Sequence, residues 1–338
     1  MSSVLRPSAI DDEAPITELL ARVFRVGRDA DFVNPALLRW KYWEPRPDCP
    51  EPRSFVMDED GRIVAHAGLW PVTVRTADGT ERGVHMIDWA SDPRAPGAGI
   101  SILQYVKERY DFIYSIGGSE MTQTIMPKFG FRAAGSALTF ARPLRPWRQI
   151  LQHQSRDARL PLRLARNLWW SKTPARAHTP GWVATEAAAG ELDALVAPAC
   201  ERDANFLGYL QRCPSARCLV FHILNEGRKS GFFALSVVGK QVRLAGLWLE
   251  NPALESWRIA LCLAQDAALR HTAASELVFR TANEAAAAAA AQAGLRLRAQ
   301  TPVIVLRKGR PEAALPLHFQ MWDNDSAFLG SGGTEFLT

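Results

Sequence analysis

Two segments far apart in the chain follow one pattern, and this repeat constrains the fold more than any other feature of the sequence. "SEMTQTIMPKFGFR", residues 119–132, and "NEAAAAAAAQAGLR", residues 283–296, each begin with a small polar residue and a glutamate. After nine further residues, each continues with a glycine, an apolar residue and an arginine. Such self-similarity is typical of a duplicated structural unit. At 338 residues the chain is long enough for two domains.

The first copy is predicted to be a mixed α/β unit. A strand and a helix are expected in 3–24, a short helix and a proline-rich loop in 34–52, and a meander in 54–91 with turns at "DEDG" and "ADGT". A helix in 99–112, a strand in 112–118, a short helix in 119–129 and a closing strand in 130–144 complete the unit. Its order is mostly that of an antiparallel sheet flanked by helices.

The second copy repeats this order. Its pattern predicts a strand and a helix in 180–199, a meander in 217–250, a helix in 251–272 and a strand in 276–282. The alanine run 285–291 is interpreted as a helix, because alanine is the best helix former, and 294–308 as the last strand. We therefore expect an α/β (α+β) fold with domains at 1–145 and 181–310, a basic helical connector at 146–180 and a tail at 311–338.

Composition narrows the class of protein. The chain is 47% hydrophobic and 22% charged, which is ordinary for a globular protein. The amino terminus lacks the apolar core of a secretory signal, and no run of about 18 apolar residues could span a bilayer, so a cytoplasmic protein is expected. Five scattered cysteines without a C-x-x-C pair indicate free thiols, with no disulfide framework and no metal site; they are Cys49, Cys200, Cys213, Cys218 and Cys262.

The basic residues are concentrated between the two copies. Residues 142–176 hold nine lysines and arginines against one acid, Asp157. This segment either faces a phosphate-bearing partner or an anionic membrane, or it is a solvated connector that packs on the neighbouring domains. The apolar residues available for such packing are Leu151, Leu160, Leu162, Leu164 and Trp169. Without base-reading chemistry, no nucleic-acid partner is expected.

A glycine turn, "DPRAPGAGISIL" at 92–103, carries the strongest local signal for a ligand. A P-loop needs a lysine followed by serine or threonine, which Ile100 and Ser101 do not supply. A dinucleotide fingerprint needs a third glycine and a parallel setting. What remains is R-x-x-G-x-G at the start of a helix, where backbone N–H groups and the helix dipole favour an anion such as a pyrophosphate. A simple turn is the alternative.

Throughout residues 3–145 the order of elements resembles the GNAT family of acyl-CoA-dependent N-acyltransferases. "RAPGAG" fits the Q/R-x-x-G-x-G/A signature of that family, and Gly130 with Phe131 fits the G-F pair that ends its last helix. The resemblance implies an N-acyltransferase that uses acetyl-CoA, or another acyl-CoA, as co-substrate, with its pyrophosphate on the loop and its pantetheine arm along the preceding strand. The residues implied in this binding are Trp89, Ala90, Ser91, Arg94, Ala95, Pro96, Gly97, Ala98, Gly99 and Ile100.

In such enzymes an amine attacks the thioester directly, a backbone N–H of the fourth strand polarises the carbonyl, and a carboxylate, histidine or water removes the amine proton. Asp88 and His85 lie on the expected fourth strand, and their opposite parity allows only one of them to face the cleft if the strand is regular.

The tyrosine that often acts as acid in this family is replaced by Met126, and Pro127 is expected to distort that helix. Either the thiolate leaves unassisted, or another hydroxyl substitutes; the hydroxyls available are Tyr110, Tyr114, Ser115 and Ser119. We carry Asp88, His85 and Ser119 forward as catalytic candidates.

Two other stretches leave alternatives open. The aromatic residues Trp40, Tyr42 and Trp43 either pack in the core or stack on a flat acceptor. In the tail, Asp323 and Asp325 contribute to the acceptor site if the tail folds back; otherwise the end of the chain is frayed.

In the second copy "NPALESW" replaces the glycine turn, which aligns Ala253, Ser256 and Arg258 with Arg94, Gly97 and Gly99 and predicts a lost CoA site. Tandem arrangements with one active half resemble mycothiol synthase-like proteins and Fem-type aminoacyl transferases. Three functions therefore stay open: acyl transfer to an amine of a small molecule or peptide, CoA binding or scaffolding without turnover, and a Fem-type reaction with aminoacyl-tRNA.

Overall fold

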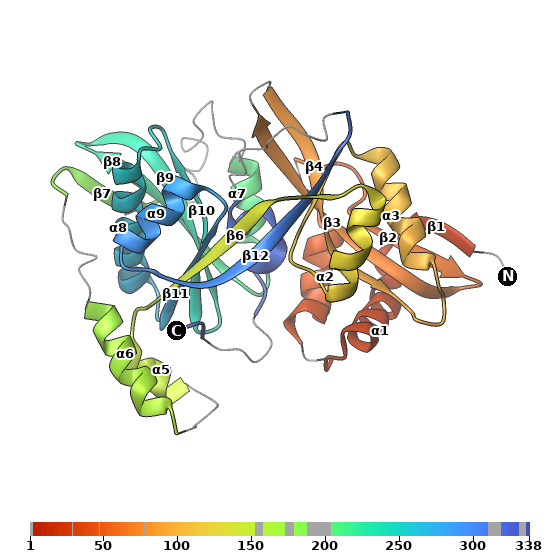
Figure 1. Ribbon diagram of the computed structural model, residues 1–338, viewed down its shortest axis with the longest axis horizontal. Coiled ribbons are helices and arrows are strands. Elements are labelled where there is room, and N and C mark those ends of the chain that lie inside the picture. The colour runs from red at the N-terminus through yellow and green to blue at the C-terminus, as the bar shows by residue number, and fades with distance from the viewer. Residues whose placement is uncertain are drawn as a thin grey trace.

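A computed structural model describes residues 3–28, 30–46, 48–76, 79–152, 158–172, 179–187, 204–309, 319–330 and 336–338. Within them lies one sheet of 12 strands with helices on its faces (Figure 1). The strands are β1 (Ser3–Pro7), β2 (Ser54–Glu59), β3 (Arg62–Thr76), β4 (Gly79–Ser91), β5 (Phe112–Ile116), β6 (Arg132–Pro143), β7 (Trp182–Glu186), β8 (Arg217–Asn225), β9 (Arg228–Val238), β10 (Gln241–Leu249), β11 (Glu276–Thr281) and β12 (Arg296–Arg307). The helices are α1 (Glu13–Phe24), α2 (Pro35–Tyr42), α3 (Ala98–Arg109), α4 (Glu120–Ile125), α5 (Pro146–Gln152), α6 (Leu160–Lys172), α7 (Ala204–Gln211), α8 (Leu254–His271) and α9 (Glu284–Gln292).

The two halves exchange their last strands. The sheet order is β1-β2-β3-β4-β5-β12-β6-β11-β10-β9-β8-β7. Each half contributes its first five strands in sequence from its own edge, and the last strand of the other half follows them. The prediction that 130–144 closes the first copy is wrong in its placement: the strand forms as β6, but it pairs with β11 and β12, while β12 pairs with β5. The central β6–β12 pair joins both halves into one continuous sheet, which leaves no exposed edge between them.

The internal repeat is confirmed in detail. Ser119 caps α4 by accepting a hydrogen bond from the N–H of Thr122 (3.2 Å), and Asn283 caps α9 in the same way from Ala286 (2.8 Å). Each segment then turns at a glycine of positive φ, Gly130 or Gly294, before β6 or β12 begins.

The two repeated helices differ in their last turn and in their burial. As predicted, Pro127 disturbs the first of them, and the chain tightens into a 3₁₀ turn over Met126–Phe129. The alanine run forms α9, whose buried methyl groups allow it to pack closely on α8.

Four of the five cysteines lie in the described part of the chain. Cys49, Cys213, Cys218 and Cys262 are free thiols, while Cys200 and the helix expected after residue 187 lie outside the described residues. Among the described residues, no group of three or more histidine, cysteine or acidic side chains could hold a metal ion. No helix in the described ranges is both long and apolar enough to cross a membrane.

Candidate functional site

The site is built around a fork between β4 and β5. These parallel strands pair only from Gly83 with Phe112 to His85 with Tyr114, and within the described residues no further pair joins them. A cross-strand gap therefore opens toward the carboxyl ends of both strands, where α3 begins. This fork lies next to a helix N-terminus, where backbone N–H groups favour an anionic group.

A β-bulge at Asp88 shapes one wall of the fork. His66 of β3 is opposite Ala90 of β4, whereas Gly68 is opposite Ile87, so β4 holds one residue more than β3 in this interval. Asp88 takes a left-handed conformation (φ 50°), uncommon for a residue with a side chain. The strand is therefore irregular where the parity argument assumed regularity, and Asp88 and His85 both lie near the fork.

Helix α2 brings a lysine and a tyrosine to the bulge. Asn34 caps this helix by accepting from the N–H of Ala36 (2.9 Å). Lys41 Nζ donates a short hydrogen bond to Asp88 Oδ2, and the Tyr42 hydroxyl donates to the same oxygen (2.5 Å). Gly68 makes this approach possible, because a Cβ there would lie 2.6 Å from the Tyr42 ring.

The carboxy-terminal tail contributes a second carboxylate. Residues of the tail cross from the second half to the first, and Asp325 Oδ2 lies 3.4 Å from Lys41 Nζ. The Trp70 indole donates to the carbonyl of Trp322 (2.9 Å), and Arg243 of β10 donates to the carbonyl of Ser326 (2.5 Å). The tail therefore folds back and brings Asp325 to this cluster. The carboxylate of Asp323 stays within the tail, where it accepts a hydrogen bond from the N–H of Gln320 (2.8 Å).

The three charged groups are almost fully removed from water: the side chain of Lys41 is 0% exposed, that of Asp88 10% and that of Asp325 11%. Burial lowers the pKa of Lys41, but the two carboxylates outweigh it and the net direction is upward. For Asp88, burial raises the pKa while Lys41 and Tyr42 lower it, and the net direction is downward. Burial, only partly offset by Lys41, raises the pKa of Asp325 to about 6.

Two buried histidines flank the cluster, and burial keeps both neutral. It lowers the pKa of His66 to about 4 and that of His85 to about 3. His66 Nδ1 lies 3.1 Å from the carbonyl oxygen of Asp88, and its Nε2 lies 2.9 Å from the hydroxyl of Ser54. His85 accepts a hydrogen bond at Nε2 from the N–H of Ile116 (3.2 Å), the second β5 residue beyond its pairing with β4. The neutral ring of His85 thus closes the base of the fork.

The glycine turn sits at the open end of the fork, and α3 begins at Ala98. Gly97 is its N-cap with φ 90°, a conformation that disfavours a side chain. The first intrahelical bond runs from the N–H of Ser101 to the carbonyl of Gly97 (2.9 Å), so the N–H groups of Gly99 and Ile100 precede it and have no acceptor within the helix. Gly99 is also tightly placed, because a Cβ there would lie 3.1 Å from that of Ser91 and 3.3 Å from the Trp89 indole nitrogen.

Arginines surround the buried carboxylate of Asp92 at this turn. Arg94 donates to it from its backbone N–H (3.0 Å) and its guanidinium, while Arg22 (3.0 Å) and Arg62 also pair with it. Three guanidinium groups therefore share one carboxylate beside the helix N-terminus. The side chain of Arg94 is engaged with Asp92, and it remains largely exposed.

The remaining predicted residues are separate from the cluster. Ser119 is exposed and serves as the cap of α4. Tyr110 bonds to Glu51 through its hydroxyl (3.3 Å), and the Tyr114 hydroxyl donates to the carbonyl of Asp323. Trp40 is buried and stacks on Tyr209 at 4.9 Å, so it is a core residue.

Lys41 and His66 were missed by sequence reasoning. Neither residue belongs to a motif. The only sign of them in the sequence is that each is a polar residue among apolar neighbours, Lys41 on α2 and His66 on β3.

The second half has a β-bulge at the corresponding place, but no carboxylate lies in it. Leu244 and Gly246 of β10 face Leu235 and Ala234 of β9, so the extra residue is Ala245, which carries no titratable group. With the bulges aligned, Leu247 corresponds to Ala90. The helix starts align Ala253, the N-cap of α8, with Gly97, rather than the Ser256 that the sequence comparison had paired with it.

The tail fills the fork of the second half. The Gln320 side chain accepts a hydrogen bond from the N–H of Leu247 and donates to its carbonyl (3.0 Å). On the other side, Gln320 bridges to Thr281 of β11. Trp322 lies directly against Gly246, where a Cβ would be 2.2 Å from the indole. In the second half, residues of the tail thus occupy the fork between β10 and β11, which corresponds to the fork between β4 and β5 in the first half.

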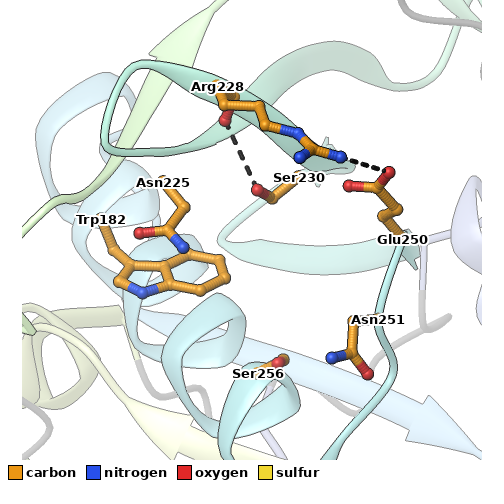
Figure 2. Close-up of a pocket in the computed structure, with 7 residues that line it drawn as sticks. All are labelled: Trp182, Asn225, Arg228, Ser230, Glu250, Asn251 and Ser256. Carbon is orange, nitrogen blue, oxygen red and sulfur yellow. Dashed lines mark hydrogen bonds and ion pairs between the residues drawn. The ribbon is translucent and has the colours of Figure 1, made fainter.

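A separate surface pocket of about 230 Å³ lies beside the start of α8 (Figure 2). It is lined by Trp182, Asn225, Arg228, Ser230, Glu250, Asn251 and Ser256. Arg228 and Glu250 form an exposed ion pair across it (2.9 Å), and Ser256 lies at its edge on α8. The chain between β10 and α8, residues 250–253, is shorter than the corresponding 92–97 and contains no glycine.

The chain resembles known proteins in its three-dimensional structure. No protein-family model matches the sequence, and no curated protein matches it either. A tandem GNAT protein from the clavulanic acid biosynthesis pathway is 12% identical, with a TM-score of 0.58, over 91% of this chain and 99% of that one.

Two further solved structures are similar over most of the chain. N-Myristoyltransferase of Saccharomyces cerevisiae, solved with bound myristoyl-CoA and inhibitors, is 12% identical with a TM-score of 0.59, over 90% of this chain and 80% of that one. A protein from Pyrococcus horikoshii, described as a putative acetyltransferase, is 12% identical with a TM-score of 0.56, over 97% and 96%. Together with the repeated order of elements on either side of the β6–β12 pair, these likenesses show that the chain has a tandem GNAT fold.

Proposed function

We propose that this protein is an acyl-CoA-dependent N-acyltransferase whose active site is the fork of the first half. The observation that carries the proposal is the buried cluster of Asp88, Lys41 and Asp325 beside that fork. With both carboxylates ionised, two negative charges face one positive charge, which leaves a net charge of about −1 in a poorly hydrated site. The ammonium form of an amine substrate supplies the missing positive charge.

The glycine turn supports the acyl-CoA half of the proposal. The N–H groups of Gly99 and Ile100 and the positive end of the α3 dipole are suited to a pyrophosphate. From there the pantetheine arm would run along β4 past Trp89 toward the bulge. The N–H of Ala90 is our candidate for polarising the thioester carbonyl, since its counterpart Leu247 holds the amide oxygen of Gln320 in the second half.

In the reaction the amine first gives up one proton, and its lone pair then forms the new C–N bond as the C–S bond breaks. We assign the proton to Asp325, because a carboxylate with a pKa near 6 is a better base than one whose pKa is lowered. Asp88 stays ionised and holds Lys41 and Tyr42 in place. The nitrogen loses its second proton as the amide forms, and the departing thiolate takes up that proton through water. His85 and Ser119 receive no step, because one fills the base of the fork and the other caps α4.

The CoA site is tested by calorimetry with acetyl-CoA on three proteins. Gly97→Glu places a negative charge and a strained side chain at the N-cap of α3, and we expect binding to be lost. Ala253→Glu places the same charge at the corresponding N-cap of α8 and serves as the matched control, with binding unchanged. Failure of the wild type to bind any acyl-CoA would overturn the proposal.

Transfer is tested by release of free CoA across a panel of primary amines. We expect Asp325→Asn to lower kcat by ~10²–10⁴-fold, the usual contribution of a general base, with little change in acetyl-CoA affinity. Binding without release by the wild type would favour a CoA-binding scaffold. Activity with aminoacyl-tRNA that survives Gly97→Glu would favour a Fem-type enzyme.

A further inference from the structure

The helical hairpin of α5 and α6 lies at one corner of the molecule (Figure 1), where α6 contacts β6 of the sheet. Its inner side includes two buried polar side chains beside the half-buried Leu160, Leu164 and Leu168. The buried side chain of Asn167 donates to Gln149 (2.9 Å), which in turn donates to the hydroxyl of Thr338 (2.9 Å). Hydrogen bonds therefore help to hold this hairpin to the body of the protein, in addition to its half-buried leucines.

Other apolar residues of α6 are exposed to solvent. Leu162 is 73% exposed and Trp169 is 67% exposed, and the small residue Ala165 is exposed with them. Positions 162, 165 and 169 are spaced by three and four residues, which places them on one face of α6. On the neighbouring helix, Trp147 is 64% exposed. We call Trp147, Leu162, Ala165 and Trp169 the outer face of the hairpin.

Basic side chains surround the outer face. Arg159 and Lys172 are exposed at the two ends of α6, and Arg148 is exposed on α5. The start of β12 adds Arg296 and Arg298, whose guanidinium groups lie 5.8 Å and 5.7 Å from the ring of Trp170. Burial, followed by the charges of Arg298 and Arg163, lowers the pKa of Arg166, so cations are crowded here. In sequence the whole segment 142–176 has one acid against nine basic residues.

We propose that the outer face of the hairpin docks on an anionic lipid bilayer. Exposed tryptophan and leucine ringed by arginine match the interface of such a bilayer, where indole rings lie at the level of the headgroups and guanidinium groups bind phosphates. A second copy of the chain is the less suitable occupant, because a symmetric contact through this face would bring the same cations together. The protein lies on the bilayer and no segment of the hairpin spans it.

The inference is tested by sedimentation of the full-length protein with vesicles of phosphatidylcholine, with and without phosphatidylglycerol. We expect binding to the anionic vesicles alone, and its loss as salt is raised. The double variant Leu162→Ser/Trp169→Ser should bind the anionic vesicles at least about tenfold more weakly, because it loses the apolar area that would be buried in the bilayer. Met121→Ser removes an apolar side chain that is 71% exposed on α4, far from the hairpin in sequence, and should bind as the wild type does.

A charge variant, Arg148→Glu/Arg159→Glu, should also lose binding while it keeps the melting temperature of the wild type. Equal binding to neutral and anionic vesicles, or unchanged binding by Leu162→Ser/Trp169→Ser, would overturn the inference. A dimer of the wild type in solution that this double variant abolishes would assign the outer face to a second copy instead.

Discussion

Replacing Lys41 with methionine tests the charge arrangement of the proposed active site. Methionine keeps most of the volume of the side chain, but it leaves Asp88 and Asp325 facing each other in a site where neither is more than 11% exposed. Removing one partner of a buried ion pair typically costs ~3–5 kcal/mol of unfolding free energy, since the remaining charge is uncompensated. We expect Lys41→Met to be destabilised by about this amount at neutral pH.

The pH dependence of this loss separates charge from packing. Without Lys41, burial and mutual repulsion raise the pKa of both carboxyl groups in the folded protein above their unfolded values. Groups of raised pKa bind protons in the folded state first, so stability is regained as pH falls. Each carboxyl group contributes ~1.4 kcal/mol per pH unit while it is protonated only in the folded state. Because Asp88 has a lowered pKa in the wild type, the gap between wild type and variant should narrow by about 1–2 kcal/mol from pH 7 to pH 5.

The assay is urea unfolding followed by circular dichroism at both pH values. Lys308→Met is the control, because its ion pair with Asp111 (3.4 Å) is exposed and should be worth no more than ~1 kcal/mol. If Lys41→Met costs no more than this control, the cluster is not an electrostatic unit. A loss that is independent of pH would assign the effect to packing alone.

Three further outcomes follow from particular contacts. Gly68→Val would drive a side chain into the Tyr42 ring, which a Cβ already meets at 2.6 Å, and should reduce acyl transfer more than acetyl-CoA affinity, as measured by kcat and calorimetry. Gly246→Val meets the indole of Trp322 at 2.2 Å and should displace the tail, which limited proteolysis would detect as new cleavage near residues 319–330. The pKa of His66 is lowered by burial to about 4, so the unfolded chain binds more protons between that value and 6.5, and stability falls as pH drops through this window. In His66→Gln the fall should be shallower by up to ~1.4 kcal/mol per pH unit, as measured by urea unfolding at pH 6.5 and pH 5.

Local signals in the sequence carried most of the secondary structure. The caps at Ser119 and Asn283, the turn at "DEDG" and the glycine of positive φ at position 97 each act within a few residues, so their effect is visible in the chain itself. The repeat identified two related units for the same reason. Which strand pairs with which is a different matter. Because β6 and β12 follow equivalent helices, either can complete either half, and only the packing of the whole sheet selects the exchange.

The candidate site was only partly predictable, because its members come from four separate parts of the chain. Asp88 was found through its place on the fourth strand, and Asp325 was considered only on the condition that the tail folds back. Lys41 was missed, since a lysine at the end of a short helix is normally exposed. Its burial is a consequence of the bulge at Asp88 and the tail at Asp325, and neither contact exists until the tertiary structure forms.

The two halves share one architecture, yet the tail makes them chemically unequal. In the second half Gln320 and Trp322 occupy the fork between β10 and β11, and the bulge there holds an alanine. A few residues later the same segment delivers Asp325 to the bulge of the first half. One segment thus closes one of two equivalent clefts and completes the charge cluster of the other. The second half also has no glycine between β10 and α8, so no counterpart of Gly97 lies beside the fork that Gln320 and Trp322 occupy.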